Sequence, residues 1–212
     1  MDKQQVYESL SRAYFSDNPD EKDILDWFAP ILSRSKCFVD FGASLGQYTR
    51  LAARNMRNGT IYAIEADPIR FEELERNCAK WQAETGNTIT AIHAAVSDKD
   101  GTITFNTTDS NVSGGIAARS INKPDVQWRE VTVPAFTIDA FFAGKPVDLV
   151  KMDIEGAEVQ ALLGGVQTLK TRSIPMFIEV HSWGNPDAVR MLMKGAGYAE
   201  TLKRGKYYFT PA

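Results

Sequence analysis

The sequence has little of what marks a secreted or membrane-bound protein. It contains two cysteines in 212 residues, Cys37 and Cys78, and their separation fits neither a zinc site nor a disulfide framework. No apolar run approaches the roughly 20 residues that a membrane span needs, and residues 1–20 are too polar for a signal peptide. We therefore expect a cytoplasmic protein without a membrane partner, with both thiols buried.

The chain also lacks an excess of positive charge. Its formal net charge is −3, whereas surfaces that bind nucleic acid are normally basic and clustered. Lys203, Arg204 and Lys206 flank Gly205 between two short strand-like runs, so we predict a solvated hairpin turn there. Nucleic acid is therefore not expected as a partner.

The hydrophobic pattern predicts an α/β fold. The chain is 43% hydrophobic and 24% charged, and strand-like and helix-like segments alternate, which is typical of a parallel sheet with helices on both faces. The core strands are expected at 37–41, 60–65, 88–96, 147–152 and 174–181, followed by an antiparallel C-terminal hairpin at 198–202 and 206–209. This order predicts a Rossmann-like, mostly parallel seven-stranded sheet. Segments 102–105 and 131–133 add strands between the third and fourth core strands.

Residues 1–35 are expected to form an N-terminal helical cover over a main domain at 36–212. Two helical stretches are predicted before residue 33, and Ile24, Leu25 and Phe28 lie on one periodic apolar face. These helices offer an interface for a homodimer, although the sequence leaves the oligomeric state open.

The first candidate ligand site is the segment VDFGASLG at 39–46. A dinucleotide-binding loop usually reads GxGxxG and holds a pyrophosphate at a helix N-terminus, where a carboxylate would repel it. Asp40 instead suits a cationic ligand, and S-adenosylmethionine carries both an ammonium and a sulfonium. Gly42 and Gly46 would let the backbone approach such a ligand closely. The same pattern also occurs in α/β proteins that bind nothing at this turn, and the missing GxGxxG makes a dehydrogenase a weaker alternative.

A second acidic residue, Glu65, ends the next predicted strand. Nucleotide-binding folds place a carboxylate for the ribose hydroxyls at roughly this interval after the glycine turn. Glu65 could also be a solvated strand-end residue, and Asp67 before Pro68 suits a helix cap. Asp40 and Glu65 in this order favour a ligand that contains a nucleoside.

Three carboxylates lie close together in KMDIEGAE at 151–158. Asp153 ends an apolar strand, so we expect it at the carboxyl edge of the sheet, where open α/β folds bind ligands. Glu155 and Glu158 are three apart at a predicted helix start and could share a face. Acids in a first turn also stabilise a helix through its dipole, which would explain one of them without a ligand.

The fifth strand carries Glu179 and His181, which share a face because strand side chains alternate with period two. We expect His181 near Asp153, where an imidazole with an unperturbed pKa of about 6.5 could accept a proton. A strand-end histidine bonded to a loop carbonyl is the alternative. We favour such a structural role for His93.

With these motifs the chain resembles the FkbM family of S-adenosylmethionine-dependent methyltransferases. The matching segments are 39–49, 64–68, 94–98, 150–158 and 162–165, and the KxDxEGxE block is the most particular to the family. The resemblance implies a class I methyltransferase fold and O-methylation of a hydroxyl on a sugar, polyketide or other small metabolite. Ala66 replaces a usual proline, and residues 111–122 have no secure match.

The mechanism that we expect is direct in-line methyl transfer to an acceptor oxygen. The expected donor contacts are Asp40, Gly42, Ala43, Gly46, Glu65, Ala66, Ser97, Asp98 and Asp153. The expected catalytic residues are Asp153 and His181, with Glu179 in support. Glu155, Ser113 and Gly114 are expected at the acceptor, under a lid formed by residues 106–128.

Two alternatives stay open. Asp153, Glu179 and His181 could instead hold Mg²⁺ or another divalent ion that orients the substrate oxygens, although we favour a mechanism without a metal. The chain could also be a non-catalytic scaffold that binds a nucleoside or a protein partner.

Overall fold

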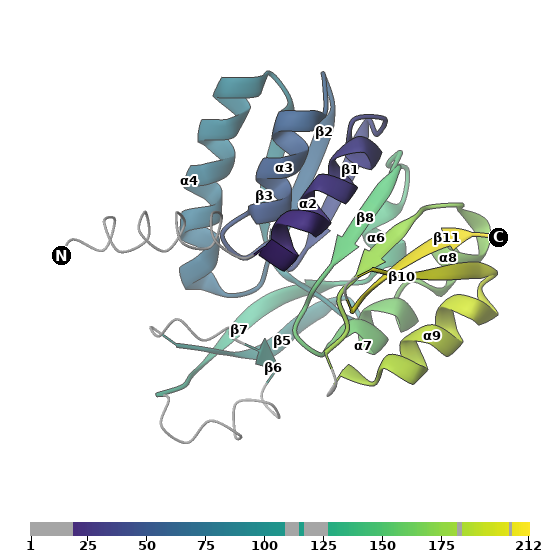
Figure 1. The fold of residues 1–212 in the computed structure, drawn as a ribbon. Helices are drawn as coiled ribbons and strands as arrows, with labels where there is room; N and C mark the ends of the chain where they lie inside the picture. Colours follow the sequence, from purple (N-terminus) through teal and green to yellow (C-terminus); the bar gives the residue numbers. More distant parts are fainter. Residues whose placement is uncertain (1–18, 109–114, 117–126, 182–183, 204) are drawn as a thin grey trace.

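The computed structural model describes residues 19–108, 115–116, 127–181, 184–203 and 205–212, and the strands among them form two sheets (Figure 1). The strands of the larger sheet are β1 (Cys37–Phe41), β2 (Thr60–Glu65), β3 (Thr88–His93), β8 (Leu149–Met152), β9 (Met176–Ile178), β10 (Tyr198–Lys203) and β11 (Lys206–Pro211). Their order is β10-β11-β9-β8-β1-β2-β3. The strands from β9 to β3 pair in parallel, whereas β11 is antiparallel to both β9 and β10. The predicted seven-stranded sheet with a C-terminal antiparallel hairpin is confirmed.

Helices cover both faces of this sheet. One face is covered by α2 (Pro19–Leu32), α3 (Gln47–Asn55) and α4 (Pro68–Thr85), and the other by α6 (Ile138–Phe142), α7 (Glu158–Leu163), α8 (Val166–Thr171) and α9 (Pro186–Gly195) (Figure 1). Because strand side chains alternate, Phe38 packs into the first core and Val39 into the second. Because both faces of the sheet are covered, side chains that point to either face are buried, and the core strands are therefore continuous apolar runs in the sequence.

The smaller sheet lies at one end of the larger one (Figure 1). Its strands are β4 (Ala95–Val96), β5 (Gly101–Thr107), β6 (Gly115–Ile116) and β7 (Arg129–Phe136), in the order β4-β7-β5-β6. The extra strands predicted at 102–105 and 131–133 are confirmed inside β5 and β7. A single strand over 88–96 is wrong, because the chain leaves the larger sheet at Ala94 and residues 95–96 pair with β7 instead.

The helix α2 is part of the sheet core. Phe28 and Leu32 are fully buried and belong to the cluster that includes Phe38 of β1. The earlier of the two predicted N-terminal helical stretches lies outside the described residues. Cys37 and Cys78 are buried and unpaired, as predicted, and burial raises the pKa of Cys78 to about 12.

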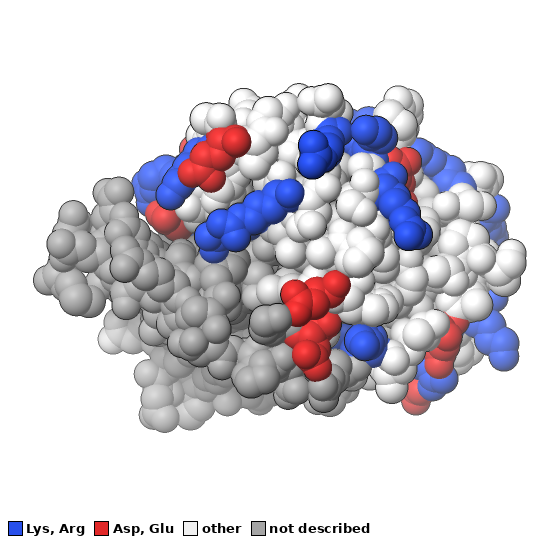
Figure 2. All heavy atoms as spheres, turned by 45° about the horizontal axis from the view of Figure 1, so that its top comes forward, with Lys and Arg blue, Asp and Glu red and all other residues white. Residues whose placement is uncertain are grey.

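Charged side chains are mixed on the face shown in Figure 2. Lys and Arg residues lie in separate groups with uncharged surface between them, and Asp and Glu residues lie close to some of these groups. Among the described residues of this face, positive charge is therefore not gathered into one strip. Within the described part of the chain, no helix is both long and apolar enough to cross a membrane.

Candidate functional site

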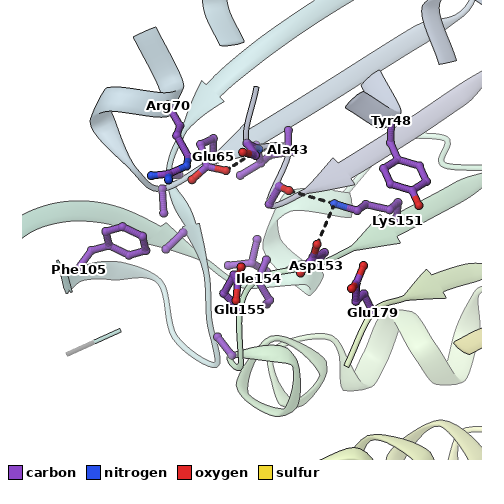
Figure 3. A pocket seen from close by; sticks show the side chains of 18 of the residues that line it. Ala43, Tyr48, Glu65, Arg70, Phe105, Lys151, Asp153, Ile154, Glu155 and Glu179 are labelled. Atoms are coloured by element: carbon purple, nitrogen blue, oxygen red, sulfur yellow. Dashed lines mark hydrogen bonds and ion pairs between the residues drawn. The ribbon is translucent and has the colours of Figure 1, made fainter. Parts of the chain in front are cut away.

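A cavity of about 390 Å³ lies where β1, β2, β8 and β9 end, a volume typical of small-molecule sites. Figure 3 shows side chains from these segments around one space. The predicted donor residues that line it are Gly42, Ala43, Glu65, Ala66 and Asp153. The predicted catalytic and acceptor residues that line it are Glu155, Glu179 and His181. The carboxyl edge of the sheet therefore brings together residues from four separate segments.

Glu65 presents a buried carboxylate to the cavity. Its Oε2 accepts a hydrogen bond from the backbone N–H of Ser44 at 2.7 Å, and its Oε1 accepts one from the N–H of Asp67 at 2.8 Å. Burial raises the pKa of Glu65, and the two backbone hydrogen bonds oppose that shift. Each carboxylate oxygen keeps a further lone pair, so a pair of vicinal hydroxyls could bind here.

Asp40 lies behind the cavity wall. It is fully buried, accepts a hydrogen bond from the Thr49 hydroxyl at 2.7 Å and lies 3.4 Å from Nζ of Lys151. Lys151 itself lines the cavity and donates to the carbonyl of Gly42 at 3.0 Å. A ligand in the cavity would therefore meet Lys151 before Asp40.

The two glycines of the turn are required by packing within the protein. Gly42 has φ +73°, and a Cβ there would lie 1.8 Å from the carbonyl oxygen of Asp153. At Gly46, with φ +96°, a Cβ would lie 2.6 Å from the Trp81 ring. Close approach of a ligand is therefore not needed to explain either glycine.

His181 lies between two carboxylates. Its Nε2 is 3.3 Å from Oδ1 of Asp153 and 3.3 Å from Oε2 of Glu155. The hydrogen bond with Asp153 raises the pKa of His181, and the charge of Glu155 adds to the shift against the effect of burial. Burial acts to raise the pKa of Asp153, but Lys151 and His181 outweigh it, so that pKa is lowered. The predicted proximity of Asp153 and His181 is confirmed. The expectation of an ordinary imidazole pKa for His181 is wrong, because its carboxylate neighbours raise that pKa.

Glu155 and Glu158 do not share a helix face, so that prediction is wrong. Glu155 lies in a turn before α7 with φ +57°, a left-handed conformation that is uncommon outside glycine. Glu158 is fully buried, and its Oε1 accepts from the N–H groups of Ile154 at 3.3 Å and Gly156 at 3.0 Å. Glu158 thus holds the turn that directs Glu155 into the cavity.

Glu179 reaches the same cluster from just beyond β9. The strand ends at Ile178, short of the predicted residue 181, and the Glu179 carboxylate lies 2.7 Å from Nζ of Lys206. One ligand atom from each of Asp153, Glu179 and His181 lies within 4.8 Å of the others. The three residues are thus close enough to share a cation, although Lys206 already neutralises Glu179.

Other predicted residues lie elsewhere. Ser97 and Asp98 follow β4 and are not among the residues that line the cavity. The Ser97 hydroxyl donates a hydrogen bond to Oδ1 of Asp98 at 3.2 Å. Ser113, Gly114 and most of the predicted lid fall outside the described residues. His93 contacts the carbonyl of Ala66 at 3.1 Å and stacks on Phe71, in line with its predicted structural role.

Several residues that line the cavity had no predicted role in the site, and the aromatic and charged ones among them are Tyr48, Arg70, Phe105, Lys151 and Lys206. Lys151 could have been found, because it lies two residues before Asp153 in the same motif. The prediction of a solvated turn is wrong for Lys206, whose side chain is only 12% exposed. Its place in the cavity depends on the pairing of β11 with β9, which local sequence does not encode.

The sequence model of the methyltransferase FkbM domain matches residues 40–199. The chain belongs to the FkbM methyltransferase family. The Glu65 carboxylate, the KMDIEGAE block and the pair of Asp153 and His181 all lie within the matched residues. The predicted family membership is thereby confirmed.

Solved structures show that this FkbM chain has the class I methyltransferase fold. The methyltransferase FkbM from Methylobacillus flagellatus KT is 18% identical, with a TM-score of 0.55 over 82% of this chain and 43% of that chain. A methyltransferase-like protein from Silicibacter pomeroyi is 15% identical, with a TM-score of 0.54 over 93% and 88% of the two chains. A methyltransferase from Geobacter sulfurreducens is 12% identical, also at 0.54, over 98% and 87%. The chain thus spans less than half the length of the M. flagellatus protein, and none of the curated protein sequences matches it.

Proposed function

We propose that this FkbM-family protein is an S-adenosylmethionine-dependent O-methyltransferase that modifies a hydroxyl group of a small molecule. One observation carries the proposal: the Glu65 carboxylate and the pair of Asp153 and His181 line the same cavity. Glu65 can receive the ribose hydroxyls of the donor, and His181 can receive a proton from an acceptor hydroxyl. Donor binding and proton removal would therefore take place side by side.

The residues of the cavity fit the donor chemically. Glu65 suits the ribose, and the carboxylates of Asp153 and Glu155 suit the positively charged groups of the methionine half. Lys151, close to Asp153, gives a partner for the carboxylate of that half. When bound, the donor supplies a methyl group on a positively charged sulfur. The chain's own part is to position this group and to exclude water from it.

His181 would serve as the proton acceptor. A neutral imidazole can donate from one ring nitrogen to Asp153 and accept the hydroxyl proton at the other. The imidazolium that results would be stabilised by Asp153 and Glu155, each 3.3 Å from Nε2 in this structure. Glu179 would keep Lys206 in place at the cavity.

A donor labelled in its methyl group tests the proposal. Wild-type protein is incubated with the labelled donor and a panel of hydroxylated sugars, polyketides and phenols, and each labelled product is analysed for a methyl ether. We expect transfer to a hydroxyl oxygen and loss of transfer in His181→Ala with donor affinity retained. Label found only on nitrogen would contradict O-methylation, and donor binding without transfer to any acceptor would favour a non-catalytic scaffold.

The metal-assisted alternative is favoured by one specific observation, the convergence of Asp153, Glu179 and His181. A divalent ion held there could orient the acceptor oxygens, but it would share the Glu179 carboxylate with Lys206, which already neutralises it. Exhaustive chelation followed by the same labelled assay decides between the two. Full activity after chelation supports the metal-free mechanism, and loss that Mg²⁺ or Mn²⁺ restores supports the metal.

A further inference from the structure

An ion pair lines the cavity on the side of the proposed proton acceptor. Lys206 begins β11 and Glu179 follows β9, next to Tyr207 and Ile178, which pair across these two antiparallel strands. Nζ of Lys206 lies 2.7 Å from Oε2 of Glu179, and both residues line the cavity. The strand pairing therefore places a cation and an anion together in the cavity wall.

The surroundings of this ion pair hold it in place. Nζ of Lys206 lies over the Tyr48 ring, 5.9 Å from its centre, and Tyr48 is buried against Phe28 and Phe177. The side chains of Lys206 and Glu179 are 12% and 25% exposed. At partly buried positions the cost of desolvation offsets much of the attraction between two charges, so such a pair is weak evidence for a role in stability. A role in binding would account for its place in the cavity.

Glu179 is close enough to His181 for both to contact one small acceptor. One nitrogen of His181, one oxygen of Glu179 and one oxygen of Asp153 lie within 4.8 Å of one another. A hydrogen bond to a hydroxyl spans about 2.5–3.2 Å. Two groups at this spacing can therefore bind two hydroxyls that are carried by neighbouring carbon atoms.

The charges in this part of the cavity favour a neutral group on the acceptor. An ammonium donates hydrogen bonds and a carboxylate accepts them, so one hydroxyl can accept from Lys206 and donate to Glu179. A carboxylate or phosphate on the acceptor would be attracted to Lys206, but it would also meet Glu179, Asp153 and Glu155, which line the same cavity. The ion pair therefore suits a hydroxyl better than an anion.

We infer that Lys206 and Glu179 bind a second hydroxyl next to the one that His181 deprotonates, so that the acceptor is a vicinal diol and the product is its monomethyl ether. The inference rests on the proposed function and adds the class of acceptor. The reacting oxygen forms its bond to the methyl carbon while the carbon–sulfur bond of the donor breaks with its electron pair left on sulfur, and the hydroxyl proton passes to His181. The neighbouring hydroxyl keeps its proton and positions the acceptor.

The labelled assay tests the inference when its acceptors are supplied in matched sets. Catechol is compared with phenol and with salicylate, in which a carboxylate replaces the second hydroxyl, and each sugar or polyketide diol is compared with its deoxy analogue. We expect kcat/KM for a diol to exceed that for its monohydroxy analogue about tenfold or more, since a hydrogen bond to a charged group contributes at least this factor. Salicylate should be no better an acceptor than phenol.

Variants of Lys206 show whether the ion pair causes this preference. Lys206→Met should raise KM for a diol about tenfold or more and change KM for the monohydroxy analogue by less than about twofold. Calorimetry with S-adenosylhomocysteine should give the wild-type affinity in this variant. Lys203→Met is the matched control, because Lys203 pairs with Lys206 across the hairpin but does not line the cavity. It should keep the wild-type preference, and thermal unfolding shows whether both variants are folded.

The possible outcomes separate this inference from the proposed function. Equal kcat/KM for diols and their monohydroxy analogues in wild-type protein would overturn the inference, and so would a preference for salicylate over catechol. A preference for diols that is unchanged in folded Lys206→Met, or lost equally in Lys203→Met, would also overturn it. In each of these cases transfer to a hydroxyl would leave the proposed function intact. If wild-type protein bound the donor but methylated no acceptor, the proposed function would fail instead.

Discussion

Nζ of Lys151 lies 3.4 Å from Oδ1 of Asp40, and the two residues are direct partners in the register of β8 and β1. Asp40 belongs to the glycine-turn motif and Lys151 to the KMDIEGAE block. Their side chains are 0% and 5% exposed, and Lys151 also lies 3.9 Å from Asp153. The ion pair therefore joins the two sequence motifs of the site across neighbouring parallel strands.

Removing Lys151 should destabilise the protein strongly. Lys151→Met leaves the buried Asp40 carboxylate without its cation, and breaking a buried ion pair in this way typically costs about 3–5 kcal/mol. Urea unfolding of the single variant and of the double variant Asp40→Asn, Lys151→Met measures the effect. We expect the double variant to recover most of the loss. A single variant as stable as wild type would contradict the assigned pairing.

The carboxylates around His181 should set the pH at which turnover falls. A base must be unprotonated, and because the pKa of His181 is raised, turnover should fall as the pH drops through a value above the ordinary 6.5. Asp153→Asn removes the largest cause of the shift, so the acidic limb should move to lower pH. Glu179→Gln is the matched control, since the charge of Glu179 is a smaller cause of the shift. Rates measured from pH 5 to 9 check this, and an unmoved limb in Asp153→Asn would exclude His181 as the base.

Substitutions of Glu155 should change the stability of the protein and its turnover in different ways. With φ +57° the residue is in a conformation that costs a non-glycine side chain about 1–2 kcal/mol. Glu155→Gly should relieve this strain and be more stable than Glu155→Ala by about 1 kcal/mol. Both variants should lose turnover, because both lack the carboxylate that faces His181. Thermal unfolding compared with the labelled assay tests this, and an alanine variant more stable than the glycine variant would refute the strain argument.

The sequence predicted those parts of the fold and site that depend on local pattern. Alternating strands and helices located the larger sheet, and strand ends placed Glu65, Asp153 and His181 at one edge. The change of sheet at Ala94 could not be predicted, because the strand-like pattern continues through residue 96 while the backbone hydrogen bonds pass from one sheet to the other.

Contacts between distant segments could not be predicted in the same way. Phe105 and Lys206 line the cavity through strand pairings that join residues far apart in the chain. Glu155 and Glu158 were assigned to one helix face because their spacing fits it, yet a residue with positive φ precedes the helix and directs the two side chains apart.

The central claim is that the cavity beside Glu65 binds S-adenosylmethionine, and isothermal titration of the donor into wild-type protein, Glu65→Gln and Glu73→Gln tests it most directly. Glu73 is a similarly buried acid on α4, pairs with Arg76 and does not line the cavity. We predict one donor bound per wild-type chain and a loss of affinity of about tenfold or more in Glu65→Gln, because hydrogen bonds to a charged group contribute about 1.5–3 kcal/mol. Glu73→Gln should bind like wild type. Absence of binding at millimolar donor, or equal affinity in all three proteins, would contradict the claim.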